Sequence, residues 1–295
     1  MNEVYTEEEE IIVVKIIKKE VLTPQIKLMV IDAPRVARHA KAGQFVIVRI
    51  NEEGERIPLT IADFDSEKGT VTIIFQEVGK STIQLGELNE GDHITDFVGP
   101  LGKEIEEKNF GHVVCVGGGV GIAPIYPKAK ALKKLGNRIT SIIGARSSDL
   151  LFWEDRMQSV SDALYVTTDD GSYGEKGFVT SVLDRVIQKE KIDLVIAVGP
   201  LMMMKMVSLL TKKYELPTLV SLNPIMVDGT GMCGCCRVTV GKECKFTCVD
   251  GPVFDGHSVD YDELLARQRN YLEEEKRAVE NWLMKKAEEG VHHAK

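Results

Sequence analysis

Several features that would define this protein's surroundings are missing from its 295 residues. No stretch of about 18 apolar residues occurs, so no transmembrane helix is expected. The N-terminus has no basic segment followed by an apolar run, and residues 7–10 form an acidic run that is typical of a solvated terminus. We therefore expect a cytoplasmic protein that does not bind membranes.

Excess positive charge is missing as well. The formal net charge is -8, and no basic stripe is available to neutralise phosphates, which argues against nucleic-acid binding. Small molecules or other proteins are the expected partners. The chain length corresponds to about two domains of roughly 150 residues each, and a hydrophobic content of 43% is ample for ordinary cores.

Cysteine is scarce except in one short segment. Five of the six cysteines lie within residues 233–248, and in a reducing compartment such clustered cysteines are more often ligands than disulfides. The sixth, Cys115, stands in an apolar run and is expected to be buried in a strand. The spacing of a plant-type [2Fe-2S] cluster is matched by Asp228, Cys233, Cys236 and Cys248. The first ligand position holds a carboxylate, and electron transfer is the first hypothesis for function.

Two other interpretations of this segment remain open. A zinc site could use Cys233, Cys236, Cys244 and Cys248, and the protein would then be a zinc-stabilised nucleotide-binding regulatory module. Asp228 could also be only a turn residue before Gly229. Visible absorption separates these alternatives, because flavin and iron-sulfur cofactors are coloured and zinc is not.

The pattern of the first 103 residues predicts a small antiparallel β-barrel. Short runs rich in β-branched residues alternate with turns. The expected strands include residues 11–17, 25–31, 44–50 and 70–77.

Residues 104–222 have the alternating pattern of a parallel α/β domain. An apolar run at 113–116 leads into a glycine-rich turn at 117–121 and then a helical pattern at 125–135, which is typical of a dinucleotide-binding unit. Further strands are expected at 138–143, 163–167 and 194–198, and helices at 150–159, 178–189 and 201–214. Residues 223–260 would form the cluster domain, and 261–295 a long charged helix with a tail. The expected fold is therefore α+β and multi-domain.

Several candidate ligand-binding residues follow the strands of the α/β domain. Ligands of open α/β sheets bind at the carboxyl ends of the strands. Arg146 follows one expected strand, and Asp169 and Asp170 follow the next, where a carboxylate could accept hydrogen bonds from ribose hydroxyls. Gly199 and Met202 follow a third strand.

Residues 56–60, Arg-Ile-Pro-Leu-Thr, resemble the flavin-binding strand of the ferredoxin reductase family. The resemblance implies that Arg56 meets the FAD diphosphate and that Thr60, the catalytic candidate, lies near the flavin N5. Arg56 stands one residue earlier than in the family pattern, and Leu59 replaces its tyrosine. Residues 78–82 resemble the second phosphate loop of the family, in which a helix N-terminus binds the diphosphate. The implied flavin contacts also include Pro58, Leu59, Ile74, Phe75, Gly79, Lys80, Ser81 and Thr82.

The glycine-rich turn is similar to the loop that lies under the pyridine nucleotide in the same family. The residues concerned are Gly118, Gly119, Val120, Gly121, Ala123 and Pro124. In that family the segment that begins at Gly199 walls the nicotinamide pocket, which adds Met202 to the implied contacts. NAD(H) is the implied ligand.

The order of barrel, nucleotide domain and cluster loop resembles the electron-transfer subunits of dihydroorotate dehydrogenase B. A closer resemblance is to the small subunits of NADH-dependent reduced ferredoxin:NADP+ oxidoreductases. The features that carry this resemblance are Asp228, the Arg56 segment and the charged C-terminal helix. This resemblance implies FAD, NAD(H) and one [2Fe-2S] cluster in this chain, and a larger partner subunit with a second FAD and [4Fe-4S] clusters. It implies flavin-based electron bifurcation with ferredoxin and NADP(H) as indirect partners. The alternative is a diaphorase subunit of a dihydroorotate dehydrogenase or hydrogenase assembly.

The charged C-terminal segment carries a possible apolar stripe. Leu264, Leu272 and Val279 are among the residues that could line one face of a helix. Trp282 and Leu283 are too apolar to be left exposed, so we expect this helix to dock on its own cluster domain or on a partner.

Overall fold

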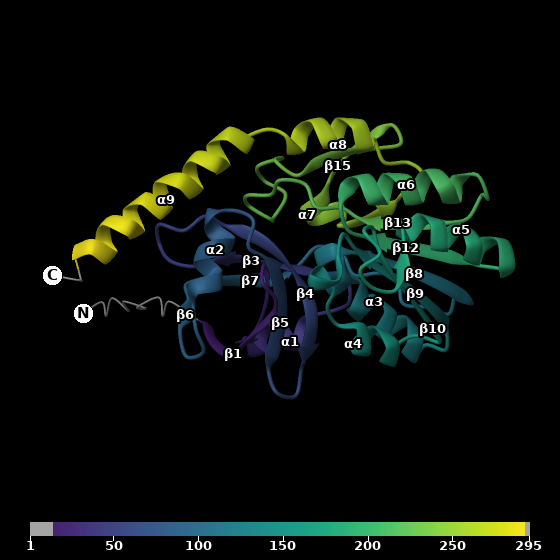
Figure 1. Ribbon diagram of the computed structural model, residues 1–295, viewed down its shortest axis with the longest axis horizontal. Helices are drawn as coiled ribbons and strands as arrows, with labels where there is room; N and C mark the ends of the chain where they lie inside the picture. The colour runs from purple at the N-terminus through teal and green to yellow at the C-terminus, as the bar shows by residue number, and fades with distance from the viewer. Residues whose placement is uncertain (1–13, 293–295) are drawn as a thin grey trace, which may run out of the picture.

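The computed structural model describes residues 14–292, with side chains up to residue 288 (Figure 1). The acidic run at 7–10 and the first three residues of the strand expected at 11–17 lie outside the described residues. A barrel and a parallel α/β sheet lie side by side, and the C-terminal segments run across both (Figure 1). The expected multi-domain α+β architecture is confirmed.

The barrel is a nearly closed antiparallel sheet of seven strands in the order β6-β1-β2-β5-β4-β3-β7. Its two edge strands, β6 and β7, follow each other directly in the chain. Alternate residues such as Val71 and Ile73 are fully buried in its interior, as β-branched side chains on a pleated sheet favour. The strands are β1 (Val14–Thr23), β2 (Ile26–Asp32), β3 (Phe45–Arg49), β4 (Ile57–Asp65), β5 (Thr70–Gln76), β6 (His93–Ile94) and β7 (Asp96–Leu101), with helices α1 (Pro34–His39) and α2 (Lys80–Glu87).

The nucleotide domain is built on a parallel sheet in the order β11-β10-β9-β8-β12-β13. Its strands are β8 (His112–Gly118), β9 (Arg138–Ala145), β10 (Ala163–Thr168), β11 (Glu175–Lys176), β12 (Leu194–Val198) and β13 (Thr218–Ser221). Its helices are α3 (Ile122–Lys134), α4 (Glu154–Ser159), α5 (Val179–Lys189) and α6 (Leu201–Lys212). β8 and β12 are buried along their whole length, as expected where helices cover both faces of a sheet.

One helix of this domain is shorter than expected. The chain forms a 3-10 turn at Ser148–Leu150 and then leaves helical geometry until α4 begins at Glu154. Phe152 is buried in the core, and the Trp153 ring packs edge-to-face on Tyr126 at 5.1 Å. The prediction of a continuous helix over 150–159 is wrong for its first half, because the packing of these two aromatic side chains overrides the local preference.

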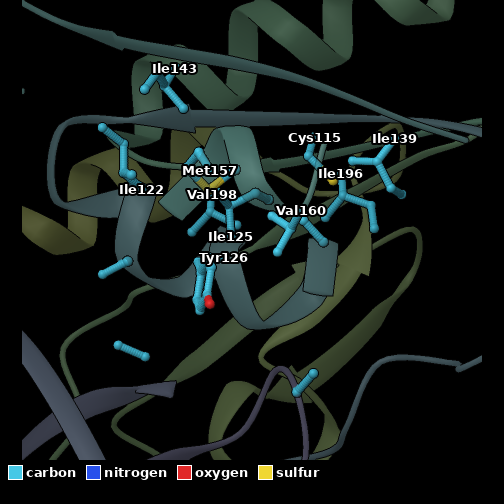
Figure 2. Packing of buried hydrophobic residues seen from close by; sticks show 14 of the residues in the cluster. Cys115, Ile122, Ile125, Tyr126, Ile139, Ile143, Met157, Val160, Ile196 and Val198 are labelled. Carbon is cyan, nitrogen blue, oxygen red and sulfur yellow. The ribbon is translucent and has the colours of Figure 1, made fainter. Parts of the chain in front are cut away.

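Helix α3 joins the nucleotide domain to the barrel. Its apolar residues Ile122, Ile125 and Tyr126 gather with residues of β8, β9, β12 and α4 (Figure 2). Cys115 is fully buried in the same cluster, as expected. On the barrel side, Lys130 Nζ donates to Asp63 Oδ1 of β4 at 2.8 Å. The two domains therefore share one continuous core.

The cluster domain contains a small hairpin and a short helix. Its elements are β14 (Arg237–Val240), β15 (Glu243–Phe246), α7 (Thr247–Asp250) and β16 (Val253–Asp255). β16 pairs antiparallel with β13 and so becomes the edge strand of the nucleotide sheet. The cluster loop is thereby tied directly to the nucleotide domain.

The C-terminal segment forms two helices, so the prediction of a single long one is wrong. α8 (Tyr261–Gln268) is capped by the Asp260 carboxylate, which accepts hydrogen bonds from the amides of Asp262 and Glu263. The helix is interrupted at Tyr271, whose φ is 72°, and α9 (Leu272–His292) begins at the next residue. The break has a physical cause: α8 packs on the cluster domain and α9 crosses the barrel helix α2, and one straight helix could not follow both surfaces (Figure 1).

The expected docking of this segment is realised only in part. Leu264 is buried, whereas Leu283 is 52% exposed. Trp282 is half-buried, with Lys286 Nζ 4.5 Å from its ring centre, and Lys286 also pairs with Glu87 at the end of α2. Within residues 14–292, no helix is long and apolar enough to cross a bilayer.

Candidate electron-transfer and nucleotide sites

Two of the four expected cluster ligands form a buried thiol pair. Cys236 follows the glycine-rich loop and Cys248 lies in α7, and their Sγ atoms are 3.2 Å apart. The Cys248 amide lies 3.4 Å from the Cys236 sulfur, to which it donates. Burial raises the pKa of the Cys248 thiol to about 12, and its hydrogen bond with Cys236 acts in the same direction. Two thiols on different elements thus meet at a separation that suits a shared metal centre.

The other two expected ligands lie on the outer part of the same loop. Asp228 Oδ2 accepts hydrogen bonds from the Thr230 hydroxyl and, at 2.9 Å, from the Thr230 amide, and these lower the pKa of the carboxyl. Cys233 is exposed, and hydrogen bonding from the Cys235 amide lowers the pKa of its thiol. These lowered pKa values favour the ionised forms of Asp228 and Cys233, which are the forms that bind a metal. No set of three metal-ligating side chains converges within residues 14–288.

The loop itself fits an iron-sulfur centre. Gly229, Gly231 and Gly234 all have positive φ, which leaves the backbone free to curl around a group and turn its amides inward. The Thr247 hydroxyl, beside Cys248, is buried and has no hydrogen-bond partner in the part of the chain that the structure describes. The remaining cysteines lie apart from the pair: Cys244 is exposed on β15, and Cys235 is half-buried. Three thiols and one carboxylate on this loop and α7 are a donor set that suits a [2Fe-2S] cluster.

The thiol pair packs directly on the barrel. Phe45 and Ile47 of β3 form one apolar cluster with Met226, Cys236 and Cys248. A side chain at Gly229 would come within 2.7 Å of Ile47, so the glycine lets the loop approach the strand. No sequence signal marked Phe45 as functional beyond its place in an expected strand, because its role arises from a tertiary contact.

The expected flavin residues line the neighbouring strand. Thr60 stands directly opposite Phe45 in the β3-β4 ladder, and Pro58 and Leu59 precede it, all half-buried. Among the residues that the structure describes, the buried Arg56 Nε has no hydrogen-bond partner, and the Arg56 Nη1 lies 3.8 Å from Asp96. A buried guanidinium N–H without an acceptor suits an anionic group, such as the diphosphate of FAD.

The expected phosphate loop begins α2. Gly79 is the residue before the helix, and a side chain there would meet open space. The Thr82 hydroxyl accepts from the amides of Val78 and Gly79 at 3.1 Å, and the Ser81 hydroxyl donates to Glu55 at 2.5 Å. The hydroxyls of Ser81 and Thr82 thus already form hydrogen bonds with other residues of the protein. Lys80 is the charged side chain of this turn.

Two expected flavin contacts lie in the interior. Ile74 is buried in the core shared by the two domains, and Phe75 is buried inside the barrel. Their side chains pack against other core residues, so only their backbone atoms could contact a cofactor.

The glycine-rich turn connects β8 to α3. Gly119 has a φ of +54° and open space where a side chain would stand. A Cβ at Gly121 would lie 2.3 Å from the Val198 carbonyl, and one at Gly118 would lie 2.3 Å from the Met203 sulfur. These glycines let the turn pack on the loop that contains Gly199. Val120 is half-buried, while Ala123 and Pro124 are buried in the first turn of α3.

The other nucleotide candidates lie along the same edge of the sheet. Gly118 pairs with Gly144 and Ala145 pairs with Thr168, so the loops after β8, β9 and β10 adjoin. Arg146, Asp169 and Asp170 are exposed there, and Met202 at the start of α6 is 50% exposed. The Asp170 carboxylate accepts hydrogen bonds from the hydroxyl and the amide of Ser172. Both hydrogen bonds lower the pKa of the carboxyl, and the one from the hydroxyl has the larger effect. The Thr167 hydroxyl, near the end of β10, is also buried and has no hydrogen-bond partner within residues 14–288.

Two family descriptions match this chain. Residues 223–260 match the iron-sulfur cluster binding domain of dihydroorotate dehydrogenase B, and residues 115–209 match the oxidoreductase NAD-binding domain. A dihydroorotate dehydrogenase B (NAD(+)) electron transfer subunit homolog from Thermotoga maritima is 51% identical over 269 residues, covering 91% of this chain and 95% of the relative. A probable electron transfer subunit of the same enzyme from Methanocaldococcus jannaschii is 37% identical over 245 residues, covering 82% and 90%.

Solved structures also resemble this chain. A chain of the NADH-dependent reduced ferredoxin-NADP oxidoreductase, studied for flavin-based electron bifurcation, has a TM-score of 0.87 and 50% identity, covering 91% of this chain and 97% of that one. The ferredoxin reductase of carbazole 1,9a-dioxygenase shares the fold, with a TM-score of 0.61 and 19% identity, covering 70% and 65%.

The barrel, the NAD-binding sheet and the iron-sulfur loop define an electron-transfer subunit of an oxidoreductase, with FAD, NAD(H) and a [2Fe-2S] cluster as its cofactors. More specifically, the chain belongs to the family of dihydroorotate dehydrogenase B electron-transfer subunits. The match to an iron-sulfur domain favours the cluster over the zinc alternative.

Proposed function

We propose that this chain is the NAD(H)-linked subunit of an electron-bifurcating NADH-dependent ferredoxin:NADP+ oxidoreductase. Its 50% identity to a chain of that enzyme, over nearly the whole length of both, supports the proposal. The observation that carries it is the contact of the Cys236–Cys248 pair with Phe45, which stands opposite Thr60. This contact places the proposed flavin strand and the proposed cluster loop next to each other, as electron passage between them requires.

The flavin site is proposed to lie along β4 and the start of α2. FAD supplies the hydride chemistry when it is bound, and the protein supplies orientation and electrostatics. Thr60 would hydrogen-bond near the flavin N5, with Pro58 and Leu59 beside it. Arg56 and Lys80 would bind the diphosphate: Lys80 lies in the first turn of α2, and the buried Nε of Arg56 is a donor for an anion. The proposed set also includes the Gly79, Ser81 and Thr82 turn and the backbone of Ile74 and Phe75.

The NAD(H) site is proposed to lie at the carboxyl edge of the parallel sheet. Gly119 would leave room for the dinucleotide, since no atom of the described residues comes within 4 Å of where its side chain would begin. Asp169 would accept hydrogen bonds from ribose, and Met202 would wall the nicotinamide. The other proposed contacts are Gly118, Val120, Gly121, Ala123, Pro124, Arg146, Asp170 and Gly199.

The proposed cluster ligands are Cys236 and Cys248 on the inner side and Asp228 and Cys233 on the outer side. The inner pair is shielded by the apolar cluster at β3, whereas Cys233 is exposed and Asp228 is half-buried. A carboxylate is a harder ligand than a thiolate, so Asp228 would change the reduction potential from that of an all-cysteine site.

A larger subunit with FAD and [4Fe-4S] clusters is the proposed partner. Around the cluster loop, Val227, Met232 and Val249 are exposed, and Met232 is 87% exposed. Such an apolar surface beside a redox centre favours protein docking, because it would otherwise remain in water. The proposed partner would cover these three residues and receive electrons there.

Assays of the native complex separate the proposal from its nearest rival. The chain should be purified with its partner from the native host, and NADP+ reduction should require both NADH and reduced ferredoxin. Dihydroorotate-dependent NAD+ reduction, without any ferredoxin requirement, would identify a dihydroorotate dehydrogenase instead.

A further inference from the structure

A cavity of about 170 Å³ lies between the cluster loop and α8. Two arginines line it, Arg237 at the start of β14 and Arg267 in the last turn of α8. Asn270, Cys235 and Leu264 also line it, together with residues of the loop before the cluster. None of its lining residues is a carboxylate.

Both guanidinium groups are anchored by backbone carbonyls of the cluster loop. Arg267 Nη2 donates to the Cys235 carbonyl at 2.9 Å, and Arg237 Nη1 donates to the Gly234 carbonyl at 3.3 Å. A guanidinium has five N–H donors, so most donors of each arginine remain for another acceptor. Across residues 14–288, neither arginine forms an ion pair with a carboxylate, and both contact backbone carbonyls instead.

We propose that this cavity binds a small oxyanion, a phosphate or a carboxylate, through Arg237, Arg267 and the Asn270 amide. Guanidinium groups match the geometry of such anions and bind them with paired hydrogen bonds. The volume is well below the ~300 Å³ or more of ordinary ligand pockets, which excludes a nucleotide and suits a small anion.

The bound anion would act on the neighbouring cluster loop. The two carbonyls that accept from the arginines are those of Gly234 and Cys235. These two residues lie between the proposed ligands Cys233 and Cys236. An anion here would offset the positive charge beside the cluster and make its reduction potential more negative, because added negative charge disfavours reduction. Binding itself does not depend on the function proposed above.

Calorimetry on the holoprotein tests the site. Inorganic phosphate and, in a separate titration, acetate are added to protein whose flavin and nucleotide sites are saturated with FAD and NAD+. At least one of these anions should bind, and Arg267→Gln should weaken its binding about tenfold or more, since one charge-assisted interaction is lost. The anion that binds with the higher affinity shows whether the natural ligand is a phosphate or a carboxylate.

Two further variants guard against a folding artefact. Arg237→Gln should weaken binding in the same direction, and Arg267→Lys should rescue part of it while the visible spectrum of the cluster stays unchanged. The matched control is Arg269→Gln, which removes the same charge from an exposed residue that does not line the cavity. Absence of binding by both anions, or equal affinity in wild type, Arg267→Gln and Arg237→Gln, would overturn the proposal.

The potential of the cluster gives a second readout. A redox titration monitored by EPR is run at the lowest anion concentration that fills the wild-type site. The midpoint should be more negative than without anion in the wild type, and the shift should be clearly smaller in Arg267→Gln, which binds the anion more weakly. A wild-type midpoint that does not move at saturating anion would overturn the inferred effect on the cluster.

Discussion

Phe45 and Thr60 stand directly opposite each other on β3 and β4, and Phe45 packs in the same apolar cluster as Cys236 and Cys248. Phe45 therefore packs with the thiol pair and is also the ladder neighbour of a residue on the proposed flavin strand. Phe45→Ala should lower the free energy of unfolding by about 3–5 kcal/mol, because it leaves a cavity between the barrel and the cluster domain. Denaturant unfolding and iron content measure the effect.

The control for this prediction is Phe178→Ala, since Phe178 is exposed and should change stability little. If Phe45→Ala were no more destabilising than Phe178→Ala, the contact between barrel and cluster loop would not contribute to stability.

Asp228 is the first residue to test as a cluster ligand. Asp228→Cys should retain a [2Fe-2S] cluster with a changed EPR signal and reduction potential, because a thiolate replaces a harder oxygen ligand. Asp228→Ala should lower cluster occupancy or alter the same signals. If Asp228→Ala left both the EPR spectrum and the potential unchanged, the carboxylate would be only a turn residue that holds Thr230.

Arg56 should contribute to FAD affinity. Arg56→Ala removes a buried N–H that has no acceptor within the described residues, and we expect FAD to bind about 10- to 100-fold more weakly. Flavin fluorescence during titration of the apoprotein measures the affinity. Arg35→Ala, which removes an exposed arginine from α1, is the control and should leave FAD binding as it is. Equal affinity in both variants would argue against a diphosphate contact by Arg56.

Gly121 and Gly118 should differ in how well they accept a side chain. A Cβ at Gly121 would meet the Val198 carbonyl, a backbone atom, whereas one at Gly118 would meet the movable end of Met203. Gly121→Ala should therefore cost about 1–3 kcal/mol of stability and weaken NAD(H) binding more than Gly118→Ala does. Thermal unfolding and NADH titration test this order, and the reverse order would contradict the packing of this turn.

Lys128 should make stability depend on pH. Burial lowers the pKa of its ammonium to about 8 from the ordinary 10.5, and its Nζ donates to the Pro124 carbonyl at 3.0 Å. Between these two values the unfolded chain holds a proton that the folded protein lacks, so the free energy of unfolding rises with pH. The contribution is about 3 kcal/mol over this window.

Lys128→Met should remove this rise and stabilise the protein near neutral pH, because an apolar side chain of similar size needs no proton. Urea unfolding at pH 7.5 and pH 10 measures the difference between variant and wild type. Lys134→Met, at an exposed position of the same helix, should keep the wild-type pH dependence. A parallel pH profile in wild type and Lys128→Met would show that Lys128 is not the cause.

The sequence alone determined many of the local elements and the donor residues of the cluster loop. The strands at 138–143 and 194–198 and the turn at 117–121 follow from apolar runs and glycine, which constrain only a few neighbouring residues. The spacing of Asp228, Cys233, Cys236 and Cys248 is likewise a local pattern. This spacing indicates the cluster without any tertiary contact, and the family match supports that cofactor.

Tertiary structure decided which surfaces meet. The packing of Cys236 and Cys248 on Phe45, the pairing of β16 with β13 and the break at Tyr271 all depend on residues far apart in the chain. Local periodicity carries no information on such contacts, because it specifies which face of an element is apolar and not what covers that face. The cavity between Arg237 and Arg267 appeared for the same reason, since the two residues come together only when α8 packs on the cluster domain.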